Sequence, residues 1–373
     1  MKLPHYDFPL DYNSILKRID AIDPVTYKQT RNKLHGAVTL LSPYITRGVV
    51  TLPFILERVL KNYTIKQSFK FIQELAWREY WQSVWRAKGE EIFTDLRFEQ
   101  PGVTNEEIPK SIVEATTGVE SVDAVIKGLY DSGYMHNHSR MGIASIVTNL
   151  GHAAWWHPSQ WMYYHLLDGD LASNSLSWQW VAGALRKQPY TTSQSLINYS
   201  TESDQRNSFL DYDRYDMLSL PVPEKLKETM RDSLTLNLPS SEPLRVDSSL
   251  PTHIYHAWHL DPTWHSNVEA NRILVLEPSH YEQFPVSKKV IDFIINIGKE
   301  NIPDLQVYVG EYKNLESEYA LRDVKTRSYP AINHWEHITI EPRPSLFPLT
   351  NEYHKSFYSF WKAGNKSIEQ PYE

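Results

Sequence analysis

The stretch from Tyr134 to Tyr190 constrains the fold more than any other part of the chain, because it combines bulky aromatic rings with a short charged turn. It contains five tryptophans and the turn Asp168-Gly169-Asp170. Residues 136–150 have helical spacing, and one face of that predicted helix carries Asn137, Arg140, Met141 and Ala144. A guanidinium on such a face needs a carboxylate or a planar partner, and the aspartates of the turn are the nearest candidates.

A second predicted helix follows the turn. Asp170, Asn174 and Trp178 are four residues apart, so a helix places an acceptor, an amide and an indole in one column. Such a column suits a large flat ligand, with hydrogen bonds at its edge and an aromatic surface beside it. On spacing alone, however, a tryptophan-rich core with a structural Arg–Asp pair is the better interpretation.

A resemblance reverses that preference. HNHSRM at 136–141, followed by LLDGDLASNSLSWQW at 166–180, resembles the flavin-binding signature of the photolyase and cryptochrome family, HNRLRM and then DGDxAxNxxxWQW. The sequence departs at His138 and Ser139, which lie off the predicted polar face. We therefore expect this departure to affect the outer surface rather than the pocket.

The resemblance implies FAD as the cofactor. Upstream, Tyr27-x-x-x-Arg31 and GAVTLLSPYITRG resemble the family's phosphate-binding element GTSxLSPYLxxG, with one hydroxyl lost at Val38. Backbone N–H groups at a helix N-terminus can still bind the phosphates, although Ser42-Pro43 alone would predict only a helix cap. The cofactor-binding residues implied by the family are Tyr27, Thr39, Ser42, Asn137, Arg140, Asp168, Asp170 and Asn174, with Asn174 at flavin N5.

A further helix implies a substrate site. Glu74, Trp77, Arg78, Trp81 and Trp85 form one stripe, which is typical of a core except that its two charges need partners or a ligand. QELAWREYW resembles the family's ELxWREFY, which lines the substrate cavity. The implied substrate-binding residues are Glu74, Trp77, Arg78, Asn137, Met141 and Trp180, and the implied catalytic residues are Glu74, Asn174, Trp178 and Trp155.

The activity implied is FAD-dependent, blue-light-driven repair of cyclobutane pyrimidine dimers by electron transfer from reduced flavin. Asn137 and Met141 stand where relatives acting on (6-4) photoproducts have histidine, which favours cyclobutane dimers. Trp178 and Trp155 match the first two tryptophans of the family's electron relay, but the outer position falls near Ile112. We therefore expect weaker or rerouted photoreduction, through one of Trp156, Trp161, Tyr130 and Tyr134.

Two other hypotheses remain open. The first is a cryptochrome-like flavin photoreceptor without repair activity, which passes a light-dependent change to a protein partner. The intact cavity residues weigh against it. The second is a flavoprotein that keeps the fold and has lost the light chemistry, which the departures at Val38 and Ile112 make plausible.

The amino-acid composition further limits the metal sites, partners and cellular location that we expect. The absence of cysteine excludes disulfides, thiolate zinc sites and cysteine-ligated iron–sulfur clusters, and no metal site is predicted. A net charge of −7 argues against a protein whose whole surface binds nucleic acid.

With fewer than thirty residues before Tyr27, an N-terminal antenna domain is not expected, and UV-damaged single-stranded DNA is the predicted partner. No apolar run approaches a membrane span, so we expect a cytoplasmic protein without membrane contact.

The expected fold is mainly α, with an all-helical photolyase-type FAD-binding domain followed by a small α/β domain. The predicted boundaries are 1–218 for the helical domain, 219–268 for a proline-spaced connector with one helix at 224–234, and 269–373 for the α/β domain. Within the last domain, a strand at 272–278, a helix at 286–301 and a strand at 305–311 predict a βαβ unit. A final aromatic helix is expected at 345–364. No nucleotide motif occurs there.

Overall fold

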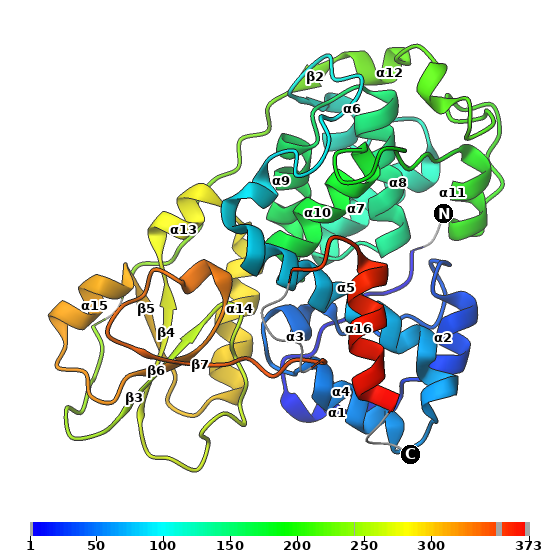
Figure 1. The fold of residues 1–373 in the computed structure, drawn as a ribbon. Helices are drawn as coiled ribbons and strands as arrows, with labels where there is room; N and C mark the ends of the chain where they lie inside the picture. Colours follow the sequence, from blue (N-terminus) through cyan, green and yellow to red (C-terminus); the bar gives the residue numbers. More distant parts are fainter. Residues whose placement is uncertain (1–2, 242, 348–352, 370–373) are drawn as a thin grey trace.

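The computed structural model describes residues 3–241, 243–347 and 353–369, and it places a helical body beside a small parallel sheet (Figure 1). The expected class, mainly α with a C-terminal α/β part, is confirmed. The helical body contains α1 (Tyr12–Asp20), α2 (Pro24–Thr30), α3 (Ser42–Thr46), α4 (Leu52–Leu60), α5 (Ile65–Lys88), α6 (Lys110–Val113), α7 (Glu120–Ser132), α8 (Asn137–Ser145), α9 (Trp156–His165), α10 (Leu171–Ala182) and α11 (Gln194–Thr201).

Local signals fix the two helices that matter most for the site. The α5 helix begins with a capping box, in which Thr64 and Gln67 each satisfy a backbone N–H of the other. The α10 helix has Asp170 as its N-cap, whose side chain accepts from the backbone N–H of Ser173, and Gly183 with φ 92° as its C-cap. Asp170 is therefore held at a defined helix start.

The single helix expected over 136–150 is divided. The α-helical part, α8, runs from Asn137 to Ser145, and the next turn, Ile146–Leu150, is a π-helix. His136 caps the helix instead of belonging to it, and its ring nitrogen accepts from the backbone N–H of His138. Helical periodicity predicts the common face but not a wider turn, which sequence spacing does not reveal.

The sheet contains five parallel strands in the order β5-β4-β3-β6-β7. They are β3 (Thr252–His256), β4 (Asn271–Leu276), β5 (Gln306–Val309), β6 (Lys325–Arg327) and β7 (Thr339–Glu341). The predicted βαβ unit is confirmed, since β4 and β5 are parallel neighbours and α14 (Lys288–Asn301) connects them after α13 (Pro278–Gln283). The strand order reverses at β3, as in doubly wound folds.

The connector differs from the prediction. The central strand β3 lies inside 219–268, where its sequence THIYH gave no strand signal between the prolines. The helix expected at 224–234 is only α12 (Glu224–Lys227), and it is followed by β2 (Thr229–Met230), which pairs with β1 (Ile108–Pro109) of the helical body. The connector therefore contributes to both parts, and the three domain boundaries stay a prediction.

The last helix, α16 (Phe357–Glu369), does not cover the sheet. It lies along α5 in the helical body, drawn in red in Figure 1. Its Phe357 stacks on Trp77 with ring centroids 3.7 Å apart, and its Phe360 packs on Tyr80. The helix was predicted from residue 345, but it begins only at Phe357, and the described residues 345–347 and 353–356 are not helical. Residues 348–352 of the predicted helix fall outside the described residues. The α/β segment thus returns to the helix that carries the predicted substrate residues.

Candidate functional site

One cavity of about 500 Å³ lies between α2, the loop before α3, and the helices α5, α8 and α10. Its volume is in the range of cofactor and drug-sized sites. All eight residues predicted to bind the cofactor line it, and so do all six predicted to bind the substrate. Of the predicted catalytic residues, Glu74, Asn174 and Trp178 line the cavity and Trp155 does not. Residues from one long stretch and two upstream motifs therefore meet in one place.

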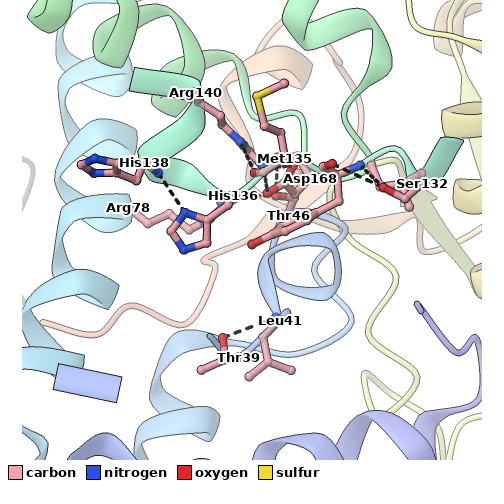
Figure 2. A network of polar contacts seen from close by, with 12 residues as sticks. Thr39, Leu41, Thr46, Arg78, Ser132, Met135, His136, His138, Arg140 and Asp168 are labelled. Carbon is pink, nitrogen blue, oxygen red and sulfur yellow. Dashed lines mark hydrogen bonds and ion pairs between the residues drawn. The ribbon is translucent and has the colours of Figure 1, made fainter. Parts of the chain in front are cut away.

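The Arg140–Asp168 pair forms as the sequence suggested. One guanidinium nitrogen of Arg140 donates to both carboxylate oxygens of Asp168 over 2.9 and 2.8 Å, and its Nε donates to the carbonyl of Met135 (Figure 2). The Asp168 side chain is only 5% exposed. The ring of Tyr134 lies 5.5 Å from the Arg140 guanidinium. This fixed pair gives one wall of the cavity a rigid, polar edge.

Asp170 has more partners than the sequence predicts. Besides capping α10, its carboxylate accepts from Gln82 and from the Tyr329 hydroxyl, and Arg78 lies 3.6 Å away. Burial alone would raise the pKa of Asp170, but the Arg78 charge and the hydrogen bonds from the Ser173 backbone N–H and the Tyr329 hydroxyl outweigh it and lower the pKa. Asp170 is therefore an ionised buried carboxylate at the cavity wall.

The Asn174 side chain is oriented by α9. Its amide nitrogen donates to the carbonyl of Ser159 over 2.9 Å, so the amide is held in one orientation within the cavity lining. The neighbouring Ser173 hydroxyl is buried and has no hydrogen-bond partner among the described residues. An unpaired buried hydroxyl in a cavity wall is a position that a bound ligand can satisfy.

Several cavity residues were missed or misplaced. His138 was expected to face outward, but it lines the cavity and burial lowers its pKa, because the first turn of α8 opens onto the cavity mouth. Arg31 was noted only as part of a motif, yet it lines the cavity and lies 3.5 Å from Glu74. Glu74 also pairs with Lys70 at 2.7 Å. His136, the cap of α8, completes the set.

The aromatic residues divide into two groups. Trp77 and Trp180 line the cavity, and Phe357 covers one ring face of Trp77. Trp178 and Trp155 are buried, with 2% and 3% exposure. The Trp155 indole N–H donates to the Asp95 carboxylate over 2.7 Å, and its ring contacts half-buried Trp156 at 5.4 Å. Ile112 is fully buried.

Comparison with known proteins agrees with this geometry. Residues 71–212 match the family described as the FAD binding domain of DNA photolyase. This segment is a photolyase-type FAD-binding domain. Its cofactor is FAD, and the cavity fits such a group, because it offers the rigid Arg140–Asp168 edge, the oriented Asn174 amide and the unpaired Ser173 hydroxyl.

The chain spans about a third of the length of the curated relatives it matches. It is 32% identical to cryptochrome DASH of Danio rerio over 168 residues, covering 42% of this chain and 32% of the relative. It is 30% identical to the deoxyribodipyrimidine photo-lyase of Streptomyces griseus over 159 residues, covering 42% and 35%. Among solved structures, the class III photolyase of Agrobacterium tumefaciens matches with a TM-score of 0.45 and 23% identity, over 50% of this chain and 41% of that chain.

Among the described residues, no helix is long and apolar enough to cross a membrane. Within the same part of the chain, no group of three or more His, Asp or Glu side chains is arranged to hold a metal ion.

Proposed function

We propose that the protein repairs cyclobutane pyrimidine dimers in DNA by light-driven electron transfer, with a preference for single strands. The observation that carries this proposal is the sharing of one cavity by the FAD-binding residues and the substrate residues Glu74, Trp77, Met141 and Trp180. A dimer entering this cavity would lie beside the cofactor.

When bound and reduced, FAD would supply the light absorption and the electron that opens the two C–C bonds joining the pyrimidines. The electron returns afterwards, so the reaction has no net redox change. The residues of this chain provide binding and orientation. Arg140 and Asp168 would hold the isoalloxazine edge, and Asn174 would lie at its N5 atom.

The substrate residues would receive a dimer that has left the base stack. A flipped base costs a few kcal/mol of stacking, which apolar walls and hydrogen bonds must offset. Trp77 and Trp180 offer the walls, and Glu74 offers a carboxylate that accepts N–H groups of the bases. Arg31 and Lys70 hold that carboxylate at the cavity mouth.

The first experiment is dimer splitting on UV-irradiated oligothymidine with chemically reduced flavin, under blue light and in darkness. We expect recovery of thymine absorbance only in light, and a faster reaction on single than on double strands. Glu74→Gln should slow it at least tenfold at subsaturating substrate, whereas Glu57→Gln on the exposed surface of α4 should not. Absence of light-dependent recovery, with FAD bound and reduced, would refute repair.

One observation favours a second candidate, a cryptochrome-like photoreceptor without repair. Phe357 of α16 is stacked on Trp77 with an interplanar angle of 8°, so this face of the proposed wall is closed to a base. If the protein repairs dimers, Phe357→Ala should strengthen dimer binding. If it is a photoreceptor, the variant should bind dimers no better, and illumination should alter the protease sensitivity of α16 in the wild-type protein.

A further inference from the structure

The cavity lined by the FAD-binding residues is called the flavin cavity below. A smaller hollow lies on the other side of Arg78 from it. It has a volume of about 90 Å³ and is enclosed by α5, by the segment after β6 and by the segment after β7. Arg78 and Ile45 line both spaces, so a single layer of side chains separates them. One water molecule needs roughly 10–15 Å³ of such space, so the hollow has room for a group of several heavy atoms.

Three arginines from distant parts of the chain meet at this hollow. Arg78 and Arg86 lie about two turns apart on α5, and Arg343 arrives on the chain that crosses from β7 to the helical body (Figure 1). Arg343 is held in place, since its guanidinium donates to the carbonyl of Ile45 over 2.9 Å and its backbone N–H donates to Ser328. The charges of Arg78 and Arg343 repel one another, and the Arg78 charge adds to burial in lowering the pKa of Arg343. An anion between them would relieve this repulsion.

The protein supplies too little negative charge to balance them. Glu79 is the one carboxylate in the described lining, and its two oxygens already accept the backbone N–H groups of Leu346 and Phe347 over 2.6 and 3.1 Å. Asp170 lies 3.6 Å from Arg78 but belongs to the flavin side. Three arginines therefore share two carboxylates. Glu79 is engaged by two backbone N–H groups, and Asp170 is shared between Arg78 and the donors Gln82 and Tyr329.

Arg86 has its donors free. It is exposed at the mouth of the hollow and makes no hydrogen bond or ion pair with any described residue, and Glu79 is the opposite charge that acts on it. The lining also includes the neutral polar side chains Gln82, Ser328, Asn333 and Ser345. Guanidinium forks beside hydroxyl and amide groups are the donor set that recognises phosphate oxygens.

We propose that this hollow is a binding site for a single phosphate-type oxyanion. Its volume admits one such group and excludes a whole nucleotide. Two kinds of molecule carry such a phosphate group, namely free inorganic phosphate and the backbone of a nucleic-acid strand. Only the second source depends on the proposed action on DNA.

The first arm of the test uses the FAD-loaded protein and inorganic phosphate, without light or damaged DNA. The unfolding temperature is followed against phosphate at constant ionic strength, with chloride as the balancing anion. We expect a saturable rise that is specific to phosphate. Arg86→Gln should weaken the apparent affinity for phosphate at least tenfold, because it removes a guanidinium from the site. The Arg86 side chain is exposed, so the substitution should not disrupt the fold. Arg322→Gln, at another exposed arginine, should leave the affinity unchanged.

The second arm uses undamaged oligothymidine in chloride buffer, with binding followed by fluorescence anisotropy. If the anion comes from a nucleic-acid backbone, Arg86→Gln should weaken oligothymidine binding at least tenfold while Arg322→Gln does not. A phosphate effect in the first arm alone identifies a free-anion site. No difference between phosphate and chloride, together with unchanged oligothymidine binding in Arg86→Gln, would overturn the proposal while leaving dimer repair untouched.

Discussion

The hydroxyl of Tyr329, in the segment after β6, donates a hydrogen bond of 2.9 Å to the carboxylate of Asp170 at the start of α10. Burial raises the pKa of Tyr329 well above its ordinary value, and the Asp170 charge acts in the same direction, so the phenol stays protonated and remains a donor. Because Asp170 also lines the flavin cavity, this bond joins the carboxyl edge of the sheet to the cofactor site.

Tyr329→Phe should weaken both the fold and the site. The substitution removes one of the donors to a buried carboxylate, which costs about 1–3 kcal/mol of unfolding free energy. We also expect severalfold weaker FAD binding, since the Asp170 side chain loses part of its support. Urea unfolding and flavin fluorescence titration measure the two effects.

Tyr308→Phe is the matched control. The Tyr308 hydroxyl makes only a 3.4 Å contact with Glu318, and Tyr308 does not line the flavin cavity. FAD affinity should therefore be unchanged in this variant. An equal loss of FAD affinity in both variants would show that the Tyr329–Asp170 bond has no special role.

Asp168→Asn should break the rigid edge of the cavity. The Arg140 guanidinium, which is 20% exposed, would lose a charged partner that it contacts at 2.8 Å. Breaking a buried pair costs about 3 kcal/mol or more. We expect a loss of that size in unfolding free energy and at least tenfold weaker FAD binding. Asp292→Asn, in an exposed pair with Lys288, should change stability by about 1 kcal/mol at most. FAD binding by Asp168→Asn equal to that of the wild type would contradict the assigned role.

The sequence predicted the fold class and which residues meet at one cavity, while the functional roles of those residues stay a prediction. Asn137, Arg140 and Met141 share a face because helical periodicity is strict, and this geometry holds whatever the tertiary context. That Arg140 pairs with a carboxylate of the Asp168-Gly169-Asp170 turn was predictable because a guanidinium of this kind requires one, and the structure selects Asp168 of the two. Those features depend on local chemistry.

Features that depend on tertiary packing were not predictable. The partners of Asp170 include Tyr329, which is 159 residues away, and no local pattern identifies it. Strand β3 is the centre of the sheet although THIYH contains two histidines, because both of them are buried as neutral rings. The docking of α16 on Trp77 depends on aromatic surfaces that periodicity assigns only to an unspecified core.

His256 should make the fold sensitive to mild acid. Burial lowers its pKa to about 4, and the ring is neutral, because Nε2 donates to the carbonyl of Arg327 while Nδ1 accepts from the Trp258 backbone. The unfolded chain takes up the proton near pH 6.5. Stability from this residue is therefore present above about pH 6.5 and is lost as the pH falls towards 4, by up to about 1.4 kcal/mol per pH unit.

His256→Gln tests this assignment, because the amide can still donate to Arg327 but does not titrate. Urea unfolding between pH 4 and pH 8 should give a shallower pH dependence for the variant than for the wild type, although the variant is less stable at pH 7. His354→Gln is the control, since the half-buried His354 ring makes one hydrogen bond, of 3.2 Å, to the nearby Ser359 hydroxyl. Parallel curves for wild type and His256→Gln would refute the assignment.

Trp156 is the residue we expect to replace the missing outer tryptophan of the electron relay. Its ring contacts Trp155 at 5.4 Å, and it is partly open to solvent, whereas Trp161 is fully buried. The Asp95 carboxylate, bonded to the Trp155 indole N–H at 2.7 Å, is placed to stabilise a positive charge on that ring and to accept its proton. Trp156→Phe should therefore slow photoreduction of the bound flavin at least tenfold without changing FAD affinity.

Trp161→Phe, the control, should leave the photoreduction rate unchanged. Transient absorption of the tryptophan radical under blue light distinguishes the variants, and Asp95→Asn should lengthen the lifetime of the protonated radical. Fast photoreduction that survives both Trp155→Phe and Trp178→Phe would remove these residues from the relay altogether.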